Sequence, residues 1–266
     1  MKTNRKNFAL LISGQAISLF GNAVLDFALA MYILEVTGSA TIYAGVLAFA
    51  TIPTILLTPL GGILADRANR KNIMVALDVL SGLSILLAAL FFHAEISIAV
   101  ISVLLVVLSI LGAFETPTVQ ACVPQMFKGD DLIKRNAVVN QISAISYLVA
   151  PILGGVLYAA LGIKPVIYIT MLCFFLTAGL ECFIRLDYQK PAVKERIVHI
   201  IKNDLMESMR FIGKEQPKIL KMLLFSTLIS FFAAGAALVG LPFIVRNILG
   251  MRAELYGLAQ SVLGLS

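Results

Sequence analysis

The sequence predicts an all-α integral membrane protein, and three observations support this fold class. Hydrophobic residues make up 59% of the 266-residue chain and charged residues only 14%, against roughly 45–50% and about 25% in soluble domains. The apolar residues come in blocks of roughly 20 or more, the length at which a helix crosses a bilayer. A membrane β-barrel would instead show short segments of alternating polarity, so we expect the spans to be helices.

Seven complete spans follow from these blocks, and an eighth begins near residue 254. The seven cover residues 8–34, 41–65, 73–93, 97–123, 137–162, 165–184 and 219–245. The first follows the polar segment MKTNRKN and superficially resembles a secretory signal. Its apolar run is too long, contains Asp26 and lacks a small-residue cleavage site, so we expect an uncleaved first helix.

Residues 186–217 form the one polar stretch long enough to be a linker. Apolar residues recur in it every three or four positions, a pattern typical of an amphipathic helix that lies along a membrane face. The sequence therefore predicts a six-helix transmembrane half over 1–185, a cytoplasmic linker over 186–217, and the start of a second half over 218–266.

Positive charge is distributed asymmetrically along the predicted topology. Eighteen of the 21 Lys and Arg residues lie on one side, before the first span and between spans 2 and 3, 4 and 5, and 6 and 7. The positive-inside rule places this side, with the N-terminus, in the cytoplasm. The net charge of +6 then sets the topology of a multi-pass cell-membrane protein, and we expect no nucleic-acid partner.

The hairpin between the second and third spans holds the most specific motif. It reads GGILADRANRKN from Gly61 to Asn72 and resembles the signature G-x-L-A-D-R-x-G-R-R/K of the major facilitator superfamily. The bland alternative is a topology anchor, which any basic hairpin would provide. Asn69 replaces the second glycine of the signature, and Asn tolerates a left-handed backbone better than most residues. The matching residues are Gly62, Leu64, Ala65, Asp66, Arg67, Arg70 and Lys71.

The resemblance implies a helical bundle of the major-facilitator type, with six helices in the N-terminal half, helix 7 and the start of helix 8. In this family the hairpin is a cytoplasmic gate. By resemblance, Arg70 would pair with Glu115 on the fourth span, and Asp78 on the third span could join this cluster. A few charge-assisted hydrogen bonds of this kind can hold one of two conformations.

A second motif lies on the fifth span, where Ala150-Pro151-Ile152-Leu153-Gly154-Gly155 resembles the antiporter motif G-P-x-x-G-G. Close packing of small residues explains Pro151, Gly154 and Gly155 almost equally well. The segments around TGSA after the first span, and VPQMFK and LIKRNA after the fourth, resemble the branch that contains macrolide-efflux proteins and the enterobactin exporter. The fourth span lacks the arginine of many drug/proton antiporters, which leaves coupling through that residue in doubt.

A polar stripe runs along the first span. A polar stripe inside hydrocarbon must face protein or a water-filled cavity, so we interpret it as a substrate contact or as a proton site at Asp26. The alternative is a hydrogen-bonded seam between helices. Glu181, four residues before Arg185, is expected to form a simple surface ion pair. The stripe consists of Gln15, Ser18, Asn22 and Asp26, and Gln141, Ser143 and Ser146 are further residues that could line a cavity.

The three cysteines, Cys122, Cys173 and Cys182, lie in or at the edges of spans without a C-x-x-C motif, so we expect core packing and no metal or cofactor. The chain contains no GxxxxGK[ST] motif and so does not draw energy from ATP itself. A membrane-embedded enzyme would need a cluster of Asp, His and Arg at a membrane face. The one such cluster in this sequence belongs to the hairpin motif, which already explains it. We therefore predict a transporter and not an enzyme.

We predict a secondary active transporter that exports a small amphiphilic compound, a drug or siderophore-like molecule, by alternating access. Its expected partners are membrane lipids, the substrate and protons, and we expect a monomer when full length. The segment around Tyr256 resembles that around Tyr43, which suggests a second copy of the first half, truncated, with about four helices still to come. The alternatives are an uptake permease of the same fold and a non-transporting truncated remnant.

Overall fold

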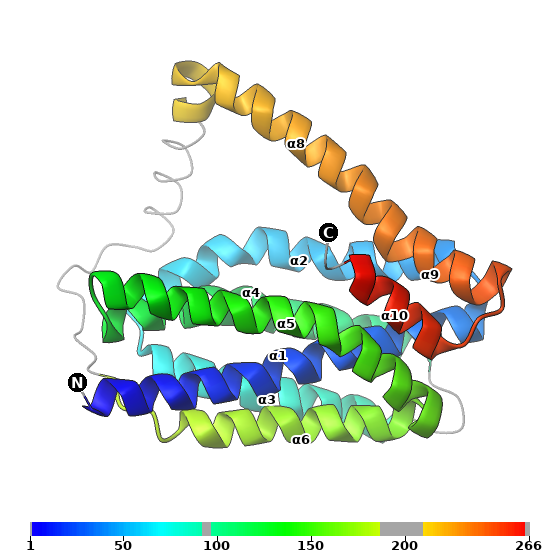
Figure 1. Ribbon diagram of the computed structural model, residues 1–266, viewed down its shortest axis with the longest axis horizontal. Coiled ribbons are helices and arrows are strands. Elements are labelled where there is room, and N and C mark those ends of the chain that lie inside the picture. The colour runs from blue at the N-terminus through cyan, green and yellow to red at the C-terminus, as the bar shows by residue number, and fades with distance from the viewer. Residues whose placement is uncertain (1, 92–96, 187–209, 264–266) are drawn as a thin grey trace.

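Six long helices form a bundle in the computed structural model, which describes residues 2–91, 97–186 and 210–263 (Figure 1). All six are long and apolar enough to cross a membrane. Each overlaps one of the first six predicted spans, and the ends differ by at most seven residues, at the start of α5. The helices are α1 (Lys2–Thr37), α2 (Ala40–Arg67), α3 (Arg70–Leu90), α4 (Ile98–Met126), α5 (Asp130–Leu161) and α6 (Ile163–Glu181).

Side-chain caps begin two of these helices, α2 and α3. The Ser39 side chain accepts a hydrogen bond from the Ile42 backbone N–H at the start of α2, and Asn69 accepts one from Asn72 at the start of α3. Asn69 has φ −71° and ψ 106°, so it does not adopt the left-handed backbone that we considered for it. Its replacement of glycine is explained by capping, a role for which Asn is among the best residues.

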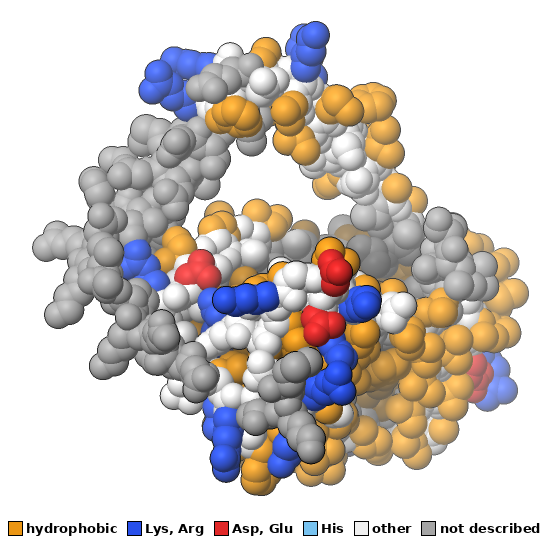
Figure 2. Space-filling view, turned by 60° about the vertical axis from the view of Figure 1, so that its left-hand side comes forward, with side chains coloured by type: hydrophobic (Ala, Val, Ile, Leu, Met, Phe, Trp, Pro, Cys, Tyr) orange, Lys and Arg blue, Asp and Glu red, His pale blue; other side chains and the backbone are white. Residues whose placement is uncertain are grey.

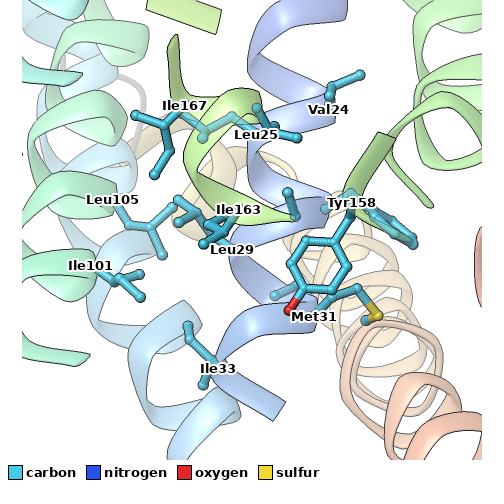
Figure 3. Close-up of a cluster of buried hydrophobic side chains, with 14 of the residues drawn as sticks. Val24, Leu25, Leu29, Met31, Ile33, Ile101, Leu105, Tyr158, Ile163 and Ile167 are labelled. Carbon is cyan, nitrogen blue, oxygen red and sulfur yellow. The ribbon is translucent and has the colours of Figure 1, made fainter. Parts of the chain in front are cut away.

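The helix α1 is central to the bundle, where it packs against α5 and α6, while α2 packs on α4 and α3 on both α4 and α6. The larger of two apolar cores surrounds the second half of α1. Figure 3 shows Leu25, Leu29 and Ile33 of α1 together with Ile101 and Leu105 of α4 in this core. Leu25, Leu29 and Ile33 are spaced four residues apart, so they lie on one face of α1. The burial of this apolar face stabilises the position of α1 in the bundle.

The seventh predicted span corresponds to helical backbone that continues from Pro217 to Ile248. It consists of α8 (Pro217–Gly235), the π-helical turn η2 (Ala236–Gly240), α9 (Leu241–Phe243) and the π-helical turn η3 (Ile244–Ile248). Helix α8 extends away from the bundle (Figure 1). The predicted eighth span corresponds to α10 (Ala253–Leu263), which packs on α5.

Most of the predicted linker, residues 187–209, lies outside the described residues. Its last part forms the π-helical turn η1 (Phe211–Glu215). The amphipathic linker and the division of the chain at 185 and 217 therefore stay predictions.

One end of the bundle carries most of the charged side chains, and we call it the basic end. The start of α1 and the turns α2–α3 and α4–α5 meet there, because consecutive helices run in opposite directions. Figure 2 shows Lys, Arg, Asp and Glu gathered over this end, beside a surface of hydrophobic side chains. Arg135 of α5 lies 4.9 Å from the Phe8 ring centroid and so ties α5 to α1 by a cation–π contact.

Candidate functional site

A polar cavity of about 150 Å³ lies inside the bundle, among α1, α3, α4, α5 and α6. Amide, hydroxyl and carboxyl groups share its wall with the apolar side chains of Leu19, Leu108 and Phe174. The polar residues that line it are Gln15, Ser18, Asn22, Ser81, Glu115, Thr116, Gln120, Asn140 and Ser143.

The predicted polar stripe of α1 divides at this cavity. Gln15, Ser18 and Asn22 line it, whereas Asp26 is not among its lining residues and has an exposed side chain. Asp26 lies four residues, or about 6 Å, further along the helix than Asn22. Of the cavity candidates on α5, Ser143 lines the wall, Ser146 is buried, and Gln141 is exposed.

The carboxyl groups of Asp78 and Glu115 lie beside the polar stripe of α1. The Ser18 hydroxyl lies 3.5 Å from Asp78 Oδ1 and 3.4 Å from Glu115 Oε1, and Gln15 Nε2 lies 3.5 Å from the same Glu115 oxygen. These hydrogen bonds are long compared with the usual 2.7–3.0 Å. Asp78 is only 1% exposed, while Glu115 also borders the cavity.

Glu181 of α6 is a third carboxyl group at this place, and the prediction of a surface pair with Arg185 was wrong. Its side chain is fully buried and interacts electrostatically with Asp78 and Glu115. The reason is that α6 ends at Glu181, so Arg185 does not follow it one turn along the same helix. Arg185 instead exchanges backbone hydrogen bonds with the Asn7 side chain.

Close packing of α6 on α1 buries Glu181. The Thr177 hydroxyl donates to the Gly14 carbonyl at 3.2 Å, and the Thr170 hydroxyl donates to the Gly21 carbonyl at 3.3 Å. A Cβ atom on Gly14 would lie 3.2 Å from the Thr177 methyl and 3.6 Å from Glu181 Cγ. The glycines and the threonines share a seven-residue spacing, and this match is a sequence signal from which the contact could have been predicted.

The hairpin motif is held by Arg70. Its guanidinium donates to the Ala65 carbonyl at 2.9 Å and to Gln125 Oε1 at 3.0 Å, and it lies 3.5 Å from Asp66 Oδ1. The predicted Arg70–Glu115 pair is wrong, because Glu115 lies ten residues before Gln125 on α4, about 15 Å along the helix axis.

Residues of the predicted gate thus divide into two groups. Asp66, Arg67 and Arg70 lie at the α2–α3 turn, with Lys71 next to Arg70. Asp78 and Glu115 lie deeper in the bundle, beside Ser18 of α1. A Cβ atom added to Gly62 of the motif would meet nothing within 4 Å, while one added to its neighbour Gly61 would meet the backbone of α4.

The α5 motif lies where α5 meets α1 and α10. Pro151, Gly154 and Gly155 are buried. A Cβ on Gly154 would lie 3.1 Å from the Phe27 ring, and the Pro151 carbonyl contacts Gly257 of α10. Phe27 also stacks on Tyr256 of α10, with ring centroids 5.2 Å apart. The small residues of the motif therefore permit both helices to approach α5.

Within residues 2–91, 97–186 and 210–263, no group of three or more His, Cys, Asp and Glu side chains is placed to hold a metal ion. Cys122 is buried and its sulfur lies 3.4 Å from that of Met74. Cys182 is exposed, so the prediction of core packing was wrong for this residue, which follows the last residue of α6.

Sequence comparison finds bacterial efflux proteins. Macrolide efflux protein A of Streptococcus pyogenes is 27% identical over 201 residues, which cover 75% of this chain and 49% of that protein. The multidrug efflux pump Tap of Mycolicibacterium fortuitum is 26% identical over 221 residues, or 79% of this chain and 53% of the pump. The chain spans about half the length of these curated relatives.

Comparison with solved structures finds the same fold. A bacterial homologue of the human lysosomal transporter Spinster superposes with a TM-score of 0.73 at 14% identity, over 98% of this chain and 60% of that one. The POT family transporter PepTSo gives a TM-score of 0.62 at 17% identity, over 97% of this chain and 53% of that one.

The family model described as Major Facilitator Superfamily matches residues 11–266. This match covers nearly all of the chain and agrees with the six-helix bundle, the hairpin motif and the structural relatives. This chain, with six helices long and apolar enough to cross a membrane, therefore belongs to the major facilitator superfamily.

Proposed function

We propose that the chain serves in proton-coupled export of a small amphiphilic compound by alternating access. The observation that supports this proposal most strongly is the cavity, which combines amide, hydroxyl and carboxyl groups with Leu19, Leu108 and Phe174. In ligand sites, apolar walls hold the body of a compound and a few polar groups fix its orientation; this cavity is richer in polar groups than such sites usually are. A compound with both an apolar body and polar substituents matches such a wall.

The direction and the substrate class rest on the relatives. Two of them are named for macrolide and multidrug efflux, and both kinds of name describe export of drug-like compounds. By this analogy the substrate of the present chain is a drug-like compound; a siderophore-like substrate rests only on the resemblance noted in the sequence. Fold alone does not set direction, and uptake by the same bundle is the outcome that the experiment below distinguishes.

We propose that the protein lies in the plasma membrane and that its basic end faces the cytoplasm. The basic residues before α1, at the α2–α3 turn and at the α4–α5 turn support this orientation through the positive-inside rule. In this orientation the Arg70 contacts form a cytoplasmic latch, which must open for substrate to pass. We further propose that the transporter acts as a monomer.

Proton coupling is energetically sufficient for useful export. One charge that crosses a potential of about 100 mV supplies roughly 2.3 kcal/mol, which corresponds to about a fifty-fold concentration ratio. Asp26, on the same face of α1 as the cavity residues, is our candidate for substrate-linked proton exchange. Its side chain is exposed on the surface of the bundle.

The test is accumulation of a fluorescent dye or of erythromycin in efflux-deficient bacteria that express the natural gene encoding this chain. We expect lower accumulation in energised cells, and restoration of accumulation by a protonophore. Asn22→Leu, in the cavity, should abolish the difference, whereas Asn72→Leu, with an exposed side chain at the basic end, should retain it. Higher accumulation in energised cells would indicate an uptake permease, and no difference for any of several amphiphilic probes would refute export.

A further inference from the structure

Three carboxyl groups from three helices meet against α1. Asp78 comes from α3, Glu115 from α4 and Glu181 from α6, and each interacts electrostatically with the other two. Ser18 of α1 lies within 3.5 Å of one oxygen of Asp78 and one oxygen of Glu115. We call these three residues the carboxyl cluster.

The unsatisfied carboxyl oxygens of Glu181 are an independent indication that this site binds a proton. The Glu181 side chain is fully buried, and neither of its carboxyl oxygens makes a hydrogen bond of normal geometry with any described residue. Asp78 Oδ2 is likewise without a donor. Buried carboxyl oxygens are nearly always hydrogen-bonded, so oxygens that face one another without a donor indicate a hydrogen between them.

No cation on the described part of the chain neutralises the cluster. Gln15 and Ser18 contribute a neutral amide and a hydroxyl. The titratable and charged groups that face the cluster from the helices around it are the three acids themselves, with Cys122 of α4 next to Glu181. Arg70 interacts with Cys122, but its hydrogen bonds go to Ala65, Asp66 and Gln125.

We infer that the carboxyl cluster is a proton-binding site, in which Asp78, Glu115 and Glu181 share at least one proton. Like charges a few ångströms apart cannot all ionise, and an uncompensated buried charge is costly at membrane depth. A metal ion is a poor alternative, because the described His, Cys, Asp and Glu side chains form no group that could hold one. The step is a simple proton transfer, in which a hydronium ion becomes water and one carboxylate becomes a carboxylic acid.

Glu115 connects the site to water. It borders the polar cavity, whereas Asp78 and Glu181 are 1% and 0% exposed. A proton therefore enters from the cavity at Glu115 and reaches the two inner acids through contacts inside the bundle. Binding of the proton at the cluster does not depend on transport, but its participation in proton coupling, together with Asp26, rests on the proposed function.

Infrared spectroscopy of the purified 266-residue chain in lipid nanodiscs tests the inference, because a protonated carboxyl group has a carbonyl band that a carboxylate lacks. We expect an acid carbonyl band at neutral pH that disappears at strongly alkaline pH. Glu181→Gln and Asp78→Asn should each remove it, since an amide supplies the hydrogen that the proton provided. Asp131→Asn, an exposed acid at the start of α5, is the control and should leave the band unchanged.

Asp26→Asn identifies any contribution of Asp26 to the band, which is then subtracted. A wild-type chain without the band at neutral pH would overturn the inference, and this measurement needs no variant to fold. Persistence of the full band in both Glu181→Gln and Asp78→Asn would overturn it as well. Loss of dye efflux with the band intact contradicts only the proposed function, and intact efflux without the band contradicts only the present inference.

Discussion

Exchange of Gly61 for alanine tests whether α2 and α4 pack backbone against backbone beside the hairpin motif. A Cβ atom at Gly61 would overlap the Ala113 carbonyl oxygen and would lie 3.0 Å from both Phe114 Cα and Pro117 Cγ. A Cβ atom at the neighbouring Gly62 would meet nothing within 4 Å in the described part of the chain. The two glycines thus form a matched pair on the same helix.

The difference between the two variants isolates the packing contribution to the free energy of unfolding. Alanine in place of glycine favours a helix by about 1 kcal/mol at either position, so this gain cancels in the comparison. Overpacking of a close contact costs about 1–3 kcal/mol. We therefore expect Gly61→Ala to be less stable than Gly62→Ala by about 1–3 kcal/mol, or roughly 2–10 °C in melting temperature.

The assay is thermal unfolding in detergent with a thiol-reactive fluorophore. Cys122 is fully buried and reacts only when the bundle opens, while the exposed Cys182 and the half-buried Cys173 are first replaced by serine to remove background. Circular dichroism of the same samples checks that the dye reports loss of helix. Equal melting temperatures for the two variants, or a higher one for Gly61→Ala, would refute the packing that we derive from the structure.

Three further variants test other parts of the site. Asp26→Asn should abolish protonophore-sensitive efflux but leave membrane insertion intact in a protease-accessibility assay; unchanged efflux would assign Asp26 a packing role. Arg70→Lys should lower efflux at least several-fold, because an ammonium group cannot reproduce the forked guanidinium contacts, and wild-type efflux in this variant would exclude the hairpin as a latch. Tyr158→Phe removes a 2.6 Å hydrogen bond to Glu35 and should lower stability by about 1–3 kcal/mol. Tyr147→Phe, at a side chain 74% exposed, is the control, and equal stability of the two would contradict the assignment.

The transmembrane helices were predictable because length and hydropathy are local properties of the chain. Their ends were less so, since a helix can continue past the apolar run. Helix α5 begins at Asp130 rather than at 137, and Asp130 and Asp131 in its first turn are favourable at a helix N-terminus. The apolar pattern alone does not contain that contribution.

The site was predictable only in part. Periodicity on α1 placed Gln15, Ser18 and Asn22 on one face, and the structure brings this face to the cavity. The partner of Arg70 could not be found in this way, because it depends on how far α3 and α4 are shifted along each other. Glu181 was missed because its burial depends on the approach of α6 to Gly14, a contact between residues far apart in the sequence.

Separation of the hairpin from the carboxyl cluster has a testable consequence. Arg70 contacts α4 at Gln125, and Glu115 lies about 15 Å further along the helix axis. At such a distance two unit charges interact by roughly 1 kcal/mol with an effective dielectric constant near 20, against about 4 kcal/mol at contact. The hairpin can therefore hold the basic end closed without supplying the charge that the cluster lacks. Arg70→Ala should weaken the hairpin and yet retain the acid carbonyl band, and loss of the band in this variant would show that the two groups act as one unit.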